Sequence, residues 1–128
     1  MKKKILLGLG LLLAVMIVST VTARMSEIGE LTRLAIDHID LANVADGIYE
    51  SNFGREVLSA RLQVTVSNGQ IAAISILEPG QGLGKAGQAM IDSILEKQSL
   101  QVDVVTGATA TSKLMLKTVE EALRQGLR

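Results

Sequence analysis

The apolar and polar positions along the chain separate one long apolar segment from a series of shorter amphipathic ones. Residues 5–23 carry no charge over nineteen consecutive positions. A helix of that length measures about 28 Å, close to the hydrocarbon thickness of a bilayer. Residues 1–23 are therefore expected to form a membrane anchor or a signal segment, for which Ala23 ends a small-residue cleavage site.

The charges beside this segment predict its orientation. Lys2, Lys3 and Lys4 precede it, whereas Arg24 is the single basic residue directly after it. Because basic residues stay on the cytoplasmic side, we expect the amino terminus inside and the rest of the chain outside the cell membrane. Arg24 disfavours cleavage, so a single-pass anchor is the preferred interpretation, and secretion after cleavage is the alternative. Residues 24–128 hold ten basic and thirteen acidic residues, a net charge of −3.

Residues 24–45 have apolar positions at the spacing of an amphipathic helix. We expect a juxtamembrane helix that ends before Asp46 and Gly47, which are typical of a turn. Such a helix would be a stalk or a cover for the following domain. His38 lies on it and is expected to be exposed or locally hydrogen-bonded. The apolar positions are Ile28, Leu31, Leu34 or Ala35, and Ile39.

Residues 46–128 are expected to form one domain that begins with a short possible strand. Apolar residues then alternate strictly with polar ones, which predicts a half-buried strand. Asn68-Gly69 is the strongest short signal for a β-hairpin, and the next residues supply the returning strand. The inward positions of the first arm are Leu58, Ala60, Leu62, Val64 and Val66.

The second half of the domain reads mainly as helix. Paired strands followed by helices indicate an α+β domain, with a small antiparallel or mixed sheet and helices packed on it, preceded by the N-terminal transmembrane helix. The expected elements are a helix over 85–98, a short strand over 100–105, and a closing helix over 113–127 that buries Leu116, Val119 and Leu123.

The composition excludes several classes of function. The chain has no cysteine and one histidine, so we expect no metal site and no catalytic residue based on a thiol or an imidazole. Basic and acidic residues are equal in number, and there is one Tyr and one Phe. Nucleic-acid binding is therefore not expected, because it relies on basic surfaces and aromatic stacking.

Residues 82–87 read G-x-G-x-x-G between a strand and a helix, as in a dinucleotide-binding loop. That interpretation is disfavoured, because the preceding strand is the second arm of an antiparallel hairpin and the chain is too short for two βαβ halves. Two interpretations remain: a loop that needs flexible glycines, and a wall beside a bound ligand. In the second, Gly82, Gly84 and Lys85 would line the ligand.

Residues 106–112 hold four hydroxyl side chains between the last predicted strand and the last helix. Three uses compete. Thr109, Thr111 or Ser112 can cap the helix; the exposed N–H groups can bind an anion such as phosphate; or a threonine oxygen can take part in chemistry, for which Lys113 is the one neighbouring base.

The segments "DGIYES", "VTVSNGQIAAISILE", "GKAGQAMIDSILEKQSLQVDVVTGATATSKLML" and "VEEAL" resemble the FMN-binding domain family. That family includes modules in the G subunit of Rnf-type ion-translocating oxidoreductases and in the C subunit of the sodium-pumping NADH:quinone reductase. The resemblance runs from about Asp46 to Leu127, and Ser51 stands where the family usually has glycine. Its most specific pattern, D-x-x-[ST]-G-A-T-x-[ST]-S, is matched by Asp103, Thr106, Gly107, Ala108, Thr109, Thr111 and Ser112.

The resemblance implies that a separate flavin transferase attaches FMN through its phosphate to Thr109. Asp103 would then be part of what the transferase recognises. Tyr49 is the one aromatic residue that we would place near the flavin ring, but a packing role in the core or at a turn is the preferred interpretation of this residue. Gly84 and Lys85 are weaker candidates for the wall of the site.

These observations together predict a membrane-anchored, extracytoplasmic flavoprotein that carries electrons between redox partner proteins. It is expected to be a carrier or a subunit of a redox complex rather than a stand-alone enzyme, since flavin accepts one or two electrons and the protein supplies its position. The alternative is an unflavinylated structural or sensory module of a membrane complex.

Overall fold

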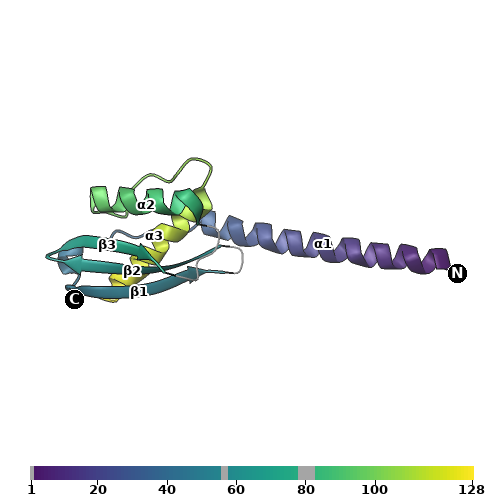
Figure 1. Ribbon diagram of the computed structural model, residues 1–128, viewed down its shortest axis with the longest axis horizontal. Helices are drawn as coiled ribbons and strands as arrows, with labels where there is room; N and C mark the ends of the chain where they lie inside the picture. Colours follow the sequence, from purple (N-terminus) through teal and green to yellow (C-terminus); the bar gives the residue numbers. More distant parts are fainter. Residues whose placement is uncertain (1, 56–57, 78–82) are drawn as a thin grey trace.

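The computed structural model describes residues 2–55, 58–77 and 83–128, and Figure 1 gives the arrangement of its elements. A long helix leads into a domain of three strands followed by two helices. In chain order the elements are α1 (Lys2–Thr32), the 3-10 helix η1 (Leu41–Asn43), β1 (Gly47–Gly54), β2 (Ser59–Ser67), β3 (Gln70–Ile76), α2 (Gly84–Lys97) and α3 (Thr109–Arg124).

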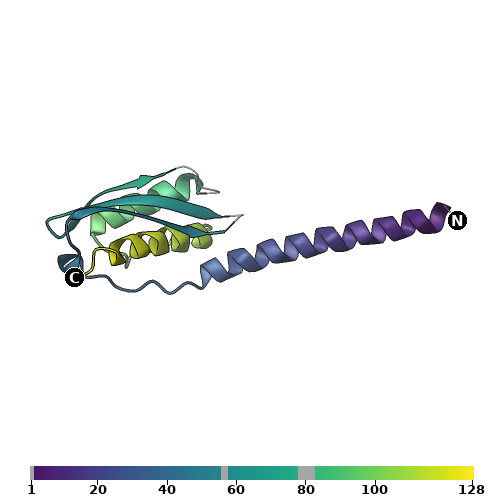
Figure 2. The same ribbon diagram turned by 90° about the horizontal axis from the view of Figure 1, so that it is seen from below.

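The domain has two layers, a sheet and a pair of helices on one of its faces (Figure 2). The strands pair antiparallel in the order β1-β2-β3. Helix α3 packs on β1 and β2, and α2 packs on β3 and on α3. The predicted α+β class is therefore confirmed, and the sheet is antiparallel rather than mixed.

The hairpin between β2 and β3 forms where the sequence predicts it. All five inward positions of its first arm are buried, at 6% exposure or less. Asn68 and Gly69 connect the strands with φ of 54° and 72°, the positive values that a type I′ turn requires at both central residues. The register of the sheet is thus set by the alternation of the first arm together with this turn.

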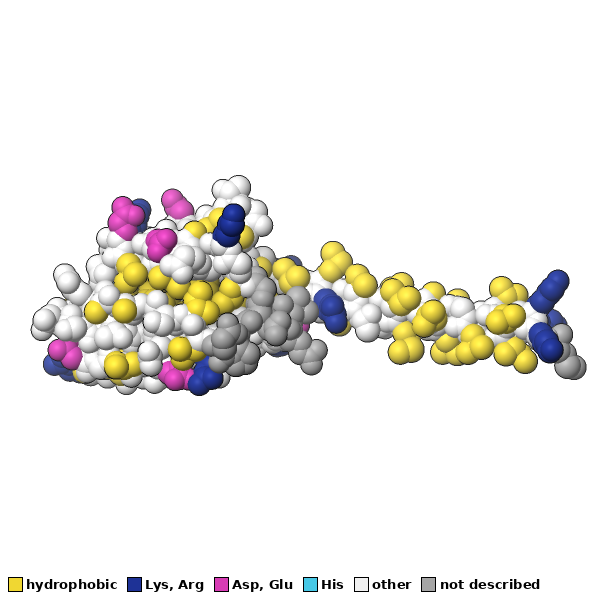
Figure 3. Space-filling model, viewed as in Figure 1, with side chains coloured by type: hydrophobic (Ala, Val, Ile, Leu, Met, Phe, Trp, Pro, Cys, Tyr) yellow, Lys and Arg dark blue, Asp and Glu magenta, His cyan; other side chains and the backbone are white. Residues whose placement is uncertain are grey.

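Helix α1 is a candidate membrane span. Of the residues that the structure describes, it is the one helix long and apolar enough to cross a bilayer, and its most apolar 18-residue stretch is fully exposed. Figure 3 shows hydrophobic side chains along the visible face of α1, between the lysines at its free end and the domain. Exposure of so many apolar side chains favours a lipid environment over water.

The predicted juxtamembrane helix over 24–45 is wrong in its second half. The helix ends at Thr32, and residues 33–40 run in a non-helical path that we call the strap. Leu34 and Ile36 are partly buried two positions apart, and Ile39 is buried. Leu34 and Ile36 thus fit the period of two of an extended segment, and Ile39 packs against the core three residues later. His38 is exposed, as expected.

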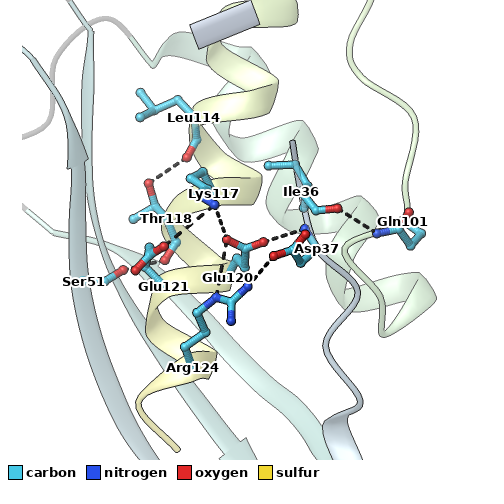
Figure 4. Close-up of polar contacts among 10 residues, drawn as sticks. All are labelled: Ile36, Asp37, Ser51, Gln101, Leu114, Lys117, Thr118, Glu120, Glu121 and Arg124. Atoms are coloured by element: carbon cyan, nitrogen blue, oxygen red, sulfur yellow. Dashed lines mark hydrogen bonds and ion pairs between the residues drawn. The ribbon is translucent and has the colours of Figure 1, made fainter. Parts of the chain in front are cut away.

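A buried carboxylate on α3 fixes the strap (Figure 4). Glu120 is fully buried; its Oε1 accepts a hydrogen bond from the Asp37 N–H at 2.5 Å, and its Oε2 pairs with Lys117 Nζ at 2.6 Å. Arg124 Nη2 contacts the Asp37 carboxylate at 2.5 Å. Glu120 thus provides an acceptor for the Asp37 N–H in place of the helix carbonyl that it would bond to if α1 continued.

The predicted strand over 100–105 is also wrong. Residues 101–105 have no regular secondary structure, although Leu100 is buried and Val102 and Val105 pack against the core. The sheet contains β1, β2 and β3 alone among the described residues. The apolar alternation therefore reflects packing of one side of an extended segment, without a partner strand.

Candidate functional site

The hydroxyl-rich segment forms a tight turn followed directly by α3. Thr106 and Gly107 make the turn, and α3 begins at Thr109, four residues earlier than the sequence predicts. Gly107 has φ of +81° with open space around its Cα, so glycine is needed here for its backbone conformation and not for lack of room.

One of the four hydroxyls has a structural role. Ser112 is fully buried; its Oγ accepts a hydrogen bond from the Val105 N–H at 2.9 Å and donates one to the Ala108 carbonyl at 2.7 Å. It thereby holds the turn against the first turn of α3. No side chain caps α3, whose N-cap is Ala108, so the capping interpretation is wrong for this helix.

The other three hydroxyls make no hydrogen bond within the part of the chain that the structure describes. Thr106 is exposed, and Thr109 and Thr111 are partly buried. The first N–H groups of α3 lack a side-chain cap, and the first turn contains no acidic residue. Uncapped N–H groups and the positive end of the helix dipole make this terminus suitable for an anion.

Thr109 lines a groove between α3 and the end of α1. The groove has a volume of about 610 Å³. Ile28 and Thr32 lie on the α1 side and Leu58 precedes β2, whereas residues 107–111 form the α3 side. Figure 1 shows the end of α1 beside the start of α3. The groove therefore combines apolar side chains with a polar helix terminus.

The remaining predicted site residues lie outside this groove. Asp103 is exposed and borders a different hollow, together with Lys113. Gly84 and Lys85 begin α2 at the end of the domain where α3 also begins (Figure 1), but they do not line the groove with Thr109. Gly82 lies outside the described residues. The structure thus leaves Asp103 accessible to another protein.

The glycine motif serves packing in the part that the structure describes. Leu83 is buried, and a methyl group on Gly87 would lie 3.1 Å from its Cβ and 3.8 Å from Met115 Sδ. The preceding strand β3 is antiparallel to its neighbour. A dinucleotide-binding βαβ unit is therefore absent from the described residues.

Tyr49 does not line the groove with Thr109. Its hydroxyl donates to the Ala45 carbonyl at 2.6 Å, and a methyl group on Gly126 would lie 2.3 Å from that hydroxyl oxygen. Gly126 follows the end of α3, which is about 22 Å from Thr109 at 1.5 Å per residue. The structure thus gives Tyr49 the packing role at a turn that was the preferred interpretation.

Phe53 is the aromatic residue at the end of the domain where Thr109 lies. Strand β1 runs antiparallel to α3: Ser51 Oγ donates to the Thr118 carbonyl, and the neighbour of Phe53, Gly54, lies close to Leu114. Phe53 lines a hollow of about 420 Å³ beside Leu31 and Leu34. Tyr49 and Phe53 share the inward face of β1, and the direction of α3 decides which of them lies at this end.

Comparison with known proteins shows to which family the chain belongs. A family model described as "FMN-binding domain" matches residues 59–124, slightly more than half of the chain and including the whole hydroxyl-rich segment. The chain belongs to the FMN-binding domain family. Its cofactor is accordingly FMN, and together with α1 the family assignment fits a membrane-anchored flavin-binding protein.

The chain is also similar to two other proteins. The chain is 32% identical over 87 residues to an uncharacterized protein of Treponema pallidum (strain Nichols); the match covers 66% of this chain and 24% of that protein, so the chain spans about a quarter of its relative. It is similar in fold to the CPE2226 protein of Clostridium perfringens, with a TM-score of 0.56 and 23% identity over 65% of this chain and 88% of the other.

The groove fits FMN in its charge and polarity. FMN has an anionic phosphate at one end and a largely apolar ring at the other. The uncapped start of α3 suits the phosphate, and Ile28 and Leu58 offer apolar contacts for the rest of the molecule. Within the described residues no group of three or more His, Cys, Asp or Glu is arranged to hold a metal ion.

The distance between Tyr49 and the groove predicts that Tyr49→Phe affects stability and leaves flavin content unchanged. Tyr49→Phe removes the hydrogen bond to Ala45 and is expected to lower the free energy of unfolding by about 1 kcal/mol. Flavin content per chain, measured by absorbance, should stay at the wild-type value, because the Tyr49 ring lies at the opposite end of α3 from Thr109. A marked loss of flavin in this variant would indicate that Tyr49 contributes to flavin binding.

Proposed function

We propose that this protein is an extracytoplasmic electron carrier in which FMN is joined through its phosphate to the Thr109 hydroxyl. The observation that carries the proposal is the contrast among the four hydroxyls. Ser112 is buried and twice hydrogen-bonded, whereas Thr109 and Thr111 border a ligand-sized groove with their hydroxyls unengaged. Of these two, Thr109 is the first residue of α3 and stands at the acceptor position of the family pattern.

The local chemistry supports Thr109 as the attachment point. A phosphodiester at this position keeps one negative charge, which the uncapped N–H groups of α3 can solvate. Gly107, Ala108 and Ala110 are small, so a second enzyme can approach the hydroxyl. Asp103 is exposed six residues before Thr109, in keeping with a role in recognition by a flavin transferase.

Covalent attachment suits the composition of the domain. Retention of an ordinary flavin depends on affinity, and aromatic stacking is one of its main sources. Here Tyr49 is remote and Phe53 is the one other aromatic residue in the sequence. A tether makes retention independent of affinity, which matters most for a protein outside the cytoplasm.

The anchor determines where electrons are exchanged. The apolar segment ends at Ala23, and Ile28 in the groove is five residues further along α1, about 8 Å at 1.5 Å per residue. Bound FMN would lie close to the membrane surface. When bound, FMN supplies one- and two-electron transfer, and the chain's own residues position it for redox partner proteins at or in the membrane.

The proposal is tested with the full-length chain, produced with and without a flavin transferase. We expect a flavin-fluorescent band on a denaturing gel when the transferase is present. We also expect no steady-state turnover of the flavinylated chain until donor and acceptor proteins are added. A non-fluorescent chain would favour the unflavinylated module, and turnover by the chain alone would favour an enzyme.

A further inference from the structure

The last turns of α1 belong to the same groove as Thr109, although they lie nearly eighty residues earlier in the sequence. Ile28 and Thr32 are one helical turn apart and so lie on one face of α1. Leu31, between them, is buried at 6% exposure. The helix that carries the membrane anchor therefore contacts the domain through Leu31, and its residues Ile28 and Thr32 line the groove.

The position of this part of α1 is fixed by several independent contacts. Besides Leu31, Glu30 pairs with Arg55 at 3.5 Å at the end of β1. Downstream, the buried Glu120 holds the strap at Asp37. The exposed ion pair contributes little by itself, whereas the buried side chains and the strap oppose separation of α1 from α3.

The α1 side of the groove is apolar toward a ligand. Ile28 is an apolar side chain in a part of α1 that is mostly polar or charged, and it is 39% exposed. The Thr32 hydroxyl donates to the Gly29 carbonyl at 2.7 Å, so it is engaged within its own helix. Leu58, which is buried, completes the apolar part of the lining.

From this arrangement we infer that Ile28 and Thr32 of the anchor helix form one wall of the flavin site and contact FMN that is attached at Thr109. This inference rests on the proposed function and adds to it the residues that enclose the flavin from the membrane side. The cofactor site is then shared between the domain and the anchor helix. The fluorescence of the bound flavin would therefore depend on the position of α1.

The test uses tryptophan as a contact probe in the full-length flavinylated protein. Tryptophan quenches flavin fluorescence on direct contact. Ile28→Trp and Thr32→Trp are each expected to lower the fluorescence per bound FMN several-fold. Arg33→Trp is the matched control, because Arg33 is exposed and does not line the groove; its fluorescence should equal that of the wild type.

Intact mass measured on the same samples separates the possible results. If both groove variants carry FMN with undiminished fluorescence, the inferred wall is refuted while the proposed function stands. If the wild-type chain carries no FMN, the proposed function fails and the inference fails with it. If a groove variant melts at the wild-type temperature but takes up no FMN, while Arg33→Trp is loaded, bulk in the groove excludes the flavin and the inference is supported.

Discussion

Thr109→Ala is expected to abolish covalent flavin incorporation, leaving a chain of unmodified mass and no fluorescent band on a denaturing gel. The substitution removes the one oxygen to which we assign the phosphate. It should leave the fold intact, since the Thr109 hydroxyl makes no hydrogen bond in the described part of the chain and alanine is the better helix former.

Three neighbouring variants make this result specific. Thr109→Ser keeps a hydroxyl and should retain flavin, whereas Thr111→Ala should be loaded like the wild type because its hydroxyl is not the acceptor. Ser112→Ala is expected to destabilise the fold by about 1–3 kcal/mol, since it leaves the Val105 N–H without its partner. Flavin bound to the Thr109→Ala chain under denaturing conditions would contradict the assignment.

Glu120→Ala is expected to cause the largest loss of stability, about 3–5 kcal/mol, because it removes one partner of a buried ion pair. The Asp37 N–H loses its acceptor, and Lys117, whose side chain is 19% exposed, loses its closest counterion. Urea unfolding of the full-length chain in detergent, followed by circular dichroism, measures the effect.

The adjacent carboxylate provides the control. Glu121 is 43% exposed and lies 3.9 Å from Lys117 Nζ, so Glu121→Ala should change stability by less than about 1 kcal/mol. Glu120→Gln keeps an acceptor for the Asp37 N–H, so its loss of stability should lie between those of Glu120→Ala and Glu121→Ala. An unfolding midpoint of Glu120→Ala equal to that of the wild type would show that the strap is held by its apolar side chains alone.

The parts of the fold that the sequence predicted well are those with a single periodicity and a specific turn. The alternation from Leu58 to Val66 fits only a strand, and Asn68-Gly69 requires positive φ at two successive residues, so the hairpin has no competing solution. Helix α2 likewise has one apolar stripe, and its predicted bounds differ from the observed ones by a single residue at each end.

The errors occurred where two periodicities coexist or where tertiary contacts decide. Leu31, Ala35 and Ile39 fit a helical spacing, whereas Leu34 and Ile36 fit an extended one. The choice depends on Glu120, more than eighty residues later. Residues 100–105 alternate like a strand but have no partner in the sheet. The wall formed by Ile28 could not be predicted, because it depends on where α1 docks on the domain.

The candidate site was predictable only in its local part. The pattern around Thr109 identified the segment, and the start of α3 gives a physical reason for binding phosphate there. Which aromatic residue lies at this end of the domain depends on the antiparallel course of β1 and α3. The sequence alone therefore did not identify Phe53, which the structure places there.

The central claim is tested most directly by locating the flavin on the protein purified from the membranes of the cell that makes it. Trypsin releases residues 98–113, which contain all four hydroxyls of the segment. We predict that this peptide is heavier by one esterified FMN and that its fragment ions place the added mass on Thr109. An unmodified peptide, or FMN on Thr106, Thr111 or Ser112, would contradict the account.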